Sequence, residues 1–227
     1  MKLLRPLSCL LALIPLAAAF GQHVLIDFGN HLTAPSTSQT WNNLTSSAPL
    51  APNRIDLLDA QGAASDVGLY VITAFSGSNA SGTQTPAAHL PPSTVTRDSL
   101  FANVDPFEGK SNVEPKLDLD GLVPGRRYSL RFFASRMGAT DNRTARYTIT
   151  GEQTVTVELD AANNTDRVAL ATVVPTAEGT LSIVITPADS NNNANHFTYL
   201  VFCRINSYTY TNQRALLGGW VQKHGCN

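Results

Sequence analysis

Residues 121–136 read Gly-Leu-Val-Pro-Gly-Arg-Arg-Tyr-Ser-Leu-Arg-Phe-Phe-Ala-Ser-Arg, and the order of apolar and polar side chains in them decides the fold class. The apolar positions are Tyr128, Leu130, Phe132 and Ala134, and the polar positions between them are Arg127, Ser129 and Arg131. Alternation with a period of two places successive side chains on opposite faces of a β-sheet. The stretch therefore predicts a strand with one face in a core and the other in water.

The same alternation recurs in many short segments on both sides of this strand. Those segments are 24–28, 67–71, 145–149, 155–159, 181–185 and 197–205. Residues 169–174 are apolar on both faces and predict a central strand. Turn-forming residues separate the segments at a spacing of roughly ten residues, which is typical of sandwiches and jelly rolls. We therefore expect an all-β fold, a single antiparallel jelly-roll β-sandwich.

The turn at the start of the stretch 121–136 carries a further fold signal. Leu122, Pro124, Gly125 and Tyr128 match the tyrosine corner of sandwich domains. In that motif the tyrosine hydroxyl bonds back to the backbone and pins a connection between the sheets. The motif predicts a structural role for Tyr128 and says nothing about a ligand.

The N-terminus has the composition of an export signal. Lys2 and Arg5 precede an apolar run from Leu10 to Ala19, and small residues at its end, in 17–19 and 19–21, suit a signal peptidase. The run is shorter than the roughly 20 residues of a spanning helix, although an uncleaved anchor or a buried N-terminal helix is the alternative. The expected divisions are a signal peptide, a β-sandwich domain and a C-terminal tail, over residues 1–21, 22–207 and 208–227. The protein is then secreted, periplasmic or extracellular.

The charge of the chain argues against two classes of partner. The net charge of −1 becomes −3 once Lys2 and Arg5 leave with the signal. A mildly acidic chain offers no broad basic face for nucleic acid or for an anionic membrane, and no second apolar stretch approaches membrane length. Cys203 and Cys226 remain after cleavage, either as a disulfide or as two unpaired thiols.

Several short motifs, taken in order, resemble one family of sandwiches. They are the opening Val24-Leu25-Ile26-Asp27-Phe28-Gly29, the stretch 121–136, Arg146 to Gly151, Glu178 to Ile185 and the closing segment 197–205. The order resembles galactose-binding-like jelly rolls, especially malectin-like and related carbohydrate-binding modules. It also resembles uncharacterised exported bacterial domains that share the Asp-Phe-Gly opening and the Phe-Ala-Ser-Arg strand. The resemblance implies sugar or cell-surface binding. The loop aromatics and loop Asp that hold sugar in malectin-like modules have no position-by-position match here, so no ligand residue is carried over.

The long polar segment 30–53 contains the first candidate ligand residues. Trp41 could stack on a sugar ring while Asn43 reads its hydroxyls. The alternative is a tryptophan that folds back over one end of the sandwich, because Trp buries a large area wherever it can.

Arginines supply the second group of candidates. Arg136, Arg143 and Arg146 cluster in sequence around a polar loop, and planar guanidinium groups hold carboxylates or sugar hydroxyls well. The alternative is a solvated edge, or pairing with Asp141 and nearby acids. We select Trp41, Asn43, Arg136 and Arg146 as ligand-binding residues.

The chemistry-bearing residues predict neither a cofactor nor a catalytic site. Asp118, Asp120 and Asp189 could contribute to a calcium site, but they fall short of the six to eight oxygens that calcium takes. The histidines show no zinc spacing, and no nucleophile elbow is present. We expect no cofactor, with calcium as the weaker alternative.

These observations lead to a ranked set of functions. First is a non-catalytic exported module that binds carbohydrate or another surface polymer. Second is a structural or adhesive surface protein without a small ligand. Third is a glycan-directed hydrolase, which would need two carboxylates about 5–9 Å apart that nothing in the sequence marks.

Overall fold

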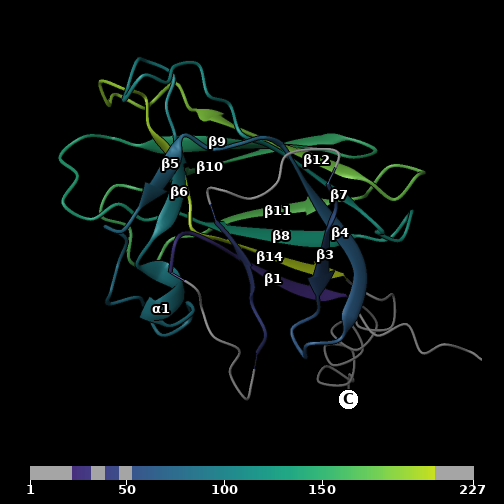
Figure 1. The fold of residues 1–227 in the computed structure, drawn as a ribbon. Helices are drawn as coiled ribbons and strands as arrows, with labels where there is room; N and C mark the ends of the chain where they lie inside the picture. Colours follow the sequence, from purple (N-terminus) through teal and green to yellow (C-terminus); the bar gives the residue numbers. More distant parts are fainter. Residues whose placement is uncertain (1–21, 32–38, 46–52, 208–227) are drawn as a thin grey trace, which may run out of the picture.

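The computed structural model describes residues 22–31, 39–45 and 53–207 of the 227-residue chain. Two large sheets face each other across the core (Figure 1). The five-stranded sheet has the order β11-β8-β14-β1-β2, with β1 (His23–Phe28), β2 (Asn42–Leu44), β8 (Tyr128–Phe133), β11 (Ala169–Val173) and β14 (Phe202–Ser207). The six-stranded sheet has the order β10-β9-β12-β7-β4-β3, with β3 (Ile55–Leu58), β4 (Ala64–Thr73), β7 (Lys116–Asp120), β9 (Thr144–Thr150), β10 (Thr154–Asp160) and β12 (Leu181–Pro187).

A third, small sheet lies beside the two large ones. Its order is β13-β6-β5, with β5 (Gly77–Asn79), β6 (Ser99–Ala102) and β13 (Thr198–Leu200). The single short helix among the described residues, α1 (Ser93–Thr96), precedes β6 (Figure 1). Every strand pair is antiparallel except β1 with β2. The expected all-β, antiparallel jelly-roll β-sandwich is confirmed.

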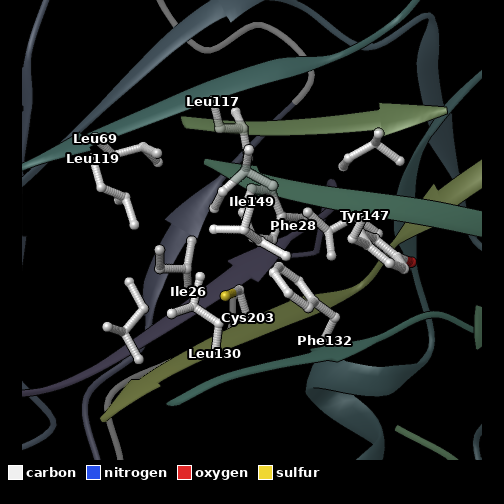
Figure 2. Packing of buried hydrophobic residues seen from close by; sticks show 14 of the residues in the cluster. Ile26, Phe28, Leu69, Leu117, Leu119, Leu130, Phe132, Tyr147, Ile149 and Cys203 are labelled. Atoms are coloured by element: carbon white, nitrogen blue, oxygen red, sulfur yellow. The ribbon is translucent and has the colours of Figure 1, made fainter. Parts of the chain in front are cut away.

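The core forms because the apolar side of each predicted strand faces the other sheet. Leu130 and Phe132 of β8 and Tyr147 and Ile149 of β9 are fully buried, as the alternation predicts. The rings of Phe132 and Tyr147 stack across the sheets with centroids 4.7 Å apart and planes 8° apart. Figure 2 shows these side chains packed together with Ile26, Phe28 and Cys203 from the other strands.

The tyrosine corner is present as the sequence predicts. The Tyr128 hydroxyl accepts a hydrogen bond of 2.9 Å from the backbone N–H of Val123. It donates in turn to the side-chain oxygen of Gln22, immediately before β1. Burial is the main cause that raises the pKa of Tyr128. One buried phenol therefore ties the turn before β8 to the start of the domain.

The prediction of a central strand at 169–174 is wrong. β11 pairs only with β8 and forms an edge of the five-stranded sheet. Its burial alternates, and Leu170 is 59% exposed. An edge strand can leave one apolar side chain in water without losing its inward packing, so composition alone did not distinguish the edge from the centre.

The predicted strand over 197–205 is divided between two sheets. β13 joins the small sheet and β14 joins the five-stranded sheet. Between them, the backbone of Val201 donates to Phe133 and accepts from Phe28. Every residue from Thr198 to Cys203 is buried, because the chain passes between layers here and has no solvent face.

Cys203 is a free, buried thiol in the core. Burial raises the pKa of this thiol, which keeps it protonated at neutral pH. Cys226, the predicted signal peptide over 1–21 and the predicted tail over 208–227 lie outside the described residues. No helix in the described part of the chain is both long and apolar enough to cross a bilayer.

Candidate functional site

A cleft of about 340 Å³ opens between the small sheet and the loops at the adjoining end of the sandwich. Its aromatic lining consists of Phe101, Phe107, Phe197 and Tyr199. Its polar lining consists of Ser78, Asn79, Glu108, Arg136 and Arg143. We refer to this site as the aromatic cleft. It combines ring surface with guanidinium, amide, hydroxyl and carboxylate groups.

The small sheet positions two of the aromatic rings. Phe101 on β6 and Tyr199 on β13 are register partners, so their side chains emerge on the same face. Their ring centroids lie 6.4 Å apart. Phe197 lies just before β13 and meets Phe101 edge to face, with centroids 5.5 Å apart. Edge-to-face contact is a favoured arrangement of aromatic rings and fixes their orientation.

A tight turn brings the fourth ring, Phe107, into the cleft. The backbones of Phe107 and Lys110 exchange two hydrogen bonds of 2.9 Å. Glu108 and Gly109 between them both have positive φ, 47° and 75°, as a two-residue hairpin turn of this kind requires. The turn places the Phe107 ring edge to face on Phe197 at 4.9 Å.

Arg143 is held in place by an acid, a phenol and an aromatic face. Its Nε donates to Asp141 at 2.6 Å, and its Nη1 donates to the Tyr199 hydroxyl at 2.6 Å. The guanidinium carbon lies 5.7 Å from the ring centroid of Phe197. Asn193 also donates to Asp141, at 2.6 Å. The hydrogen bond from Arg143 is the main cause that lowers the pKa of Asp141. The pairing with Asp141 that the sequence left open is therefore present.

The lowered pKa of Asp141 predicts a loss of stability in acid. Above about pH 4 the carboxylate is ionised in both the folded and the unfolded chain. As the pH falls below that value, the unfolded chain binds the proton first, so the free energy of unfolding decreases. We expect the free energy of unfolding of the Asp141→Asn variant to decrease less steeply than that of the wild type as the pH falls below 4. Urea unfolding at pH 7, 4 and 3 measures this. The control is Asp189→Asn, whose carboxylate is 93% exposed; equal slopes in wild type and Asp141→Asn would contradict the assignment.

Arg136 differs from Arg143 because no acid balances it. Its backbone is fixed by bonds to Ala161 and Asn163, of 2.7 and 3.0 Å. Its Nη1 donates to the carbonyl of Met137 at 2.6 Å. Within the described residues, no acidic side chain forms an ion pair with Arg136, and its buried Nε has no hydrogen-bond partner. Arg136 is therefore the cationic group of the cleft that no acidic side chain of the described residues neutralises.

The structure does not bring the other selected residues to this cleft. Trp41 is only 6% exposed, and its ring meets Phe202 edge to face at 5.8 Å. It leaves no open face for a sugar ring, and it matches the alternative of a tryptophan folded back on the sandwich. Asn43 is exposed on β2, beside β1 in the five-stranded sheet.

Arg146 lies on the outer face of the six-stranded sheet. Its guanidinium pairs with Glu158 at 2.9 Å and with Asp189 at 3.2 Å. Asp118 is 4.0 Å from Lys116, and Asp120 binds Arg54. The three acids considered for calcium thus each face a cation. Among the residues that the structure describes, no group of three or more His, Cys, Asp or Glu side chains could hold a metal ion.

Sequence reasoning missed the aromatic lining of the cleft. Phe197 and Tyr199 were assigned to an ordinary core strand, and Phe107 carried no pattern at all. The signal available in the sequence was the number of aromatic residues close to predicted turns. Whether those rings meet depends on the pairing of β6 with β13, which the sequence does not show.

The two facing sheets define a β-sandwich, and the aromatic cleft lies at one end of it. No protein-family model matches the sequence, and no curated protein matches it. Among solved structures, the ANXUR1 extracellular domain from Arabidopsis thaliana is similar, with a TM-score of 0.51, 11% identity, and coverage of 82% of this chain and 48% of that one. The ANX1 ectodomain from the same plant gives a TM-score of 0.49, 10% identity, and coverage of 82% and 48%. CBM35 from Cellvibrio japonicus Abf62 gives 0.31, 16% identity, and coverage of 56% and 84%.

The likeness to these structures concerns the fold alone. The chain spans about half the length of the plant ectodomains that it matches. The expected likeness to exported bacterial domains with an Asp-Phe-Gly opening is not tested by these comparisons and stays a prediction.

Proposed function

We propose that this protein is an exported, non-catalytic module that binds carbohydrate in the aromatic cleft. The observation that carries the proposal is the convergence of four aromatic side chains and the unbalanced guanidinium of Arg136 on one open cleft. Ligand sites typically combine apolar and aromatic walls with a few placed polar groups.

The chemistry of the lining suits a sugar. The C–H face of a pyranose packs on aromatic rings such as Phe107 and Phe197, while its hydroxyls need planar donors and acceptors. Arg136 supplies a cationic donor group, and the exposed Glu108 supplies acceptors. The side-chain oxygen of Asn79 accepts from Ser81, so Asn79 offers its amide N–H groups as donors. Arg143 is already held by Asp141 and Tyr199. Its side chain therefore loses little conformational entropy when a ligand binds against it.

Of the four residues selected from sequence, Arg136 alone belongs to the proposed binding site. Trp41 is buried away from the cleft, Asn43 lies on β2, and Arg146 is paired on the outer face of the six-stranded sheet. Binding then depends on residues of β6, β13 and the 107–110 turn rather than on the 30–53 segment.

A glycan array followed by calorimetry tests the proposal. We expect wild-type protein to bind at least one glycan, and Phe107→Ala and Arg136→Gln each to weaken that binding at least tenfold, or about 1.4 kcal/mol. Arg146→Gln is the matched control, because it removes the same charge from the far sheet, and it should bind like wild type.

Three results would contradict this assignment. Glycan binding that survives both cleft substitutions would move the site elsewhere, and self-association without any glycan effect would favour an adhesive surface protein. Turnover of chromogenic glycosides by wild-type protein would show a hydrolase instead.

A further inference from the structure

Two arginines face each other directly on the outer surface of the five-stranded sheet. Arg131 on β8 and Arg204 on β14 are register partners. Their neighbours along each strand, Leu130 and Cys203, point into the core, so both guanidinium groups are on the outer side. Like charges directly opposite each other in an antiparallel pair destabilise the sheet. This pairing therefore carries an electrostatic cost, which an anion between the two guanidinium groups would relieve.

Among the described residues, no acidic side chain forms an ion pair with either arginine. All 17 acidic residues lie in the part that the structure describes, because the segments 1–21, 32–38, 46–52 and 208–227 contain no Asp or Glu. Within the described part, none of those acids forms an ion pair with Arg131 or Arg204, and neither side chain forms a hydrogen bond there. In the described part of the chain, neither guanidinium group is therefore paired with an acid.

Aromatic rings hold Arg204 in position without neutralising it. Its guanidinium carbon lies 5.6 Å from the ring centroid of Trp41 and 5.7 Å from that of Phe202. Its Nε is buried without a hydrogen-bond acceptor. Burial, and next the charge of Arg131, lower the pKa of Arg204. Burial, and next the charge of Arg204, lower the pKa of His23, while Asp59 acts in the opposite direction. The ring contacts therefore fix the guanidinium group of Arg204 before any ligand arrives.

The sheet beside these arginines is accessible. A small apolar cluster that includes Trp41 and Phe202 covers one end of the outer face. Toward the β11 edge, Leu170 and Thr172 are exposed, and Leu170 is the register partner of Arg131. An extended ligand can therefore approach along the β11 edge.

We propose that Arg131 and Arg204 form a second binding site, for the carboxylate or sulfate groups of an acidic polysaccharide. Two adjacent guanidinium groups offer planar pairs of donors that match the oxygens of such anions. An anion placed between the two guanidinium groups offsets their mutual repulsion, so both arginines contribute to the free energy of binding.

The surroundings favour a polysaccharide over a folded protein. A stable protein interface needs a packed apolar centre, and Leu170 is the one large apolar side chain exposed on the described part of this face. Thr172 and Asn206 next to the arginines suit sugar hydroxyls. The choice of a polysaccharide as the carrier of the anion rests on the proposed function; the anion site itself does not.

Binding of four polymers to the full chain tests the site. The probes are polygalacturonate, dextran sulfate, neutral dextran and poly-glutamate, at low and at physiological ionic strength. We expect Arg131→Gln/Arg204→Gln to weaken binding of polygalacturonate or dextran sulfate at least tenfold. Raising the ionic strength should also weaken the binding of these polymers to the wild-type protein. The control, Lys116→Gln/Arg146→Gln, removes two charges from the outer face of the opposite sheet and should bind like wild type.

Each outcome decides for or against the site. A selective loss in the Arg131/Arg204 variant supports it, and the polymer that responds identifies carboxylate or sulfate. Equal weakening in the control variant, tighter binding of poly-glutamate than of both polysaccharides, or no acidic polymer bound overturns it. The variant should fold, because it removes a repulsive pair, and its melting temperature checks this. Glycan binding at the aromatic cleft should persist in this variant, so failure of one site is distinguishable from failure of the other.

Discussion

Phe132→Ala is expected to lower the free energy of unfolding by about 3–5 kcal/mol, the usual cost of truncating a buried phenylalanine. Phe132 is fully buried at the centre of the core, and its ring stacks on Tyr147 of the opposite sheet. Truncation removes the transfer free energy of the ring and the stacking contact, and it leaves a cavity that the two sheets cannot close without moving together. Urea or thermal unfolding measures the loss.

The neighbouring edge strand offers the control for this substitution. Leu170→Ala removes a large apolar side chain that is 59% exposed, on the strand that pairs with β8. Its effect should stay within about 0.5 kcal/mol, as for most surface substitutions. A loss for Leu170→Ala that approached the loss for Phe132→Ala would mean that the two sheets do not enclose a single core here.

Gly121→Ala is expected to cost about 2–5 kcal/mol, from a left-handed backbone strain of about 1–2 kcal/mol and an overpacking cost of about 1–3 kcal/mol. Gly121 directly follows β7 and has a φ of 71°. A Cβ at this position would collide with the backbone carbonyl of Asp66 on β4. Backbone cannot move aside as a flexible side chain can, so the pairing of β4 with β7 would have to shift.

Gly125 separates the two contributions to that cost. Its φ of 72° nearly equals that of Gly121, but a Cβ there would have no heavy atom within 4 Å. Gly125→Ala should therefore show the backbone strain alone, about 1–2 kcal/mol in denaturant unfolding. Equal losses for the two substitutions would show that the close approach of Asp66 does not matter.

The strands and their faces could be predicted from sequence because side-chain alternation is a local property of extended backbone. Tyr128, Leu130 and Phe132 point inward as their spacing predicts. The order of strands is not local. Residues 169–173 carry the composition of a buried strand, yet they form an edge, because which strand lies beside which depends on contacts between distant parts of the chain.

The same reason explains the mixed result for the site residues. Arg136 was selected for its chemistry and lines the aromatic cleft, whereas Trp41 was selected for its ring and is used to pack the outer face beneath Arg204. Nothing in the sequence near Phe101 indicates that Phe107 and Phe197 will meet it. Arg131 and Arg204 likewise come from strands that are far apart along the chain.

By itself, the order of residues determined that this protein is an antiparallel sandwich, which faces its strands present, and where Tyr128 fixes a corner. These features follow from backbone geometry over a few residues. Only the tertiary structure decided which rings form a cleft and which two arginines oppose each other. That information resides in the register between β6 and β13 and between β8 and β14, which forms when strands from different parts of the chain pair.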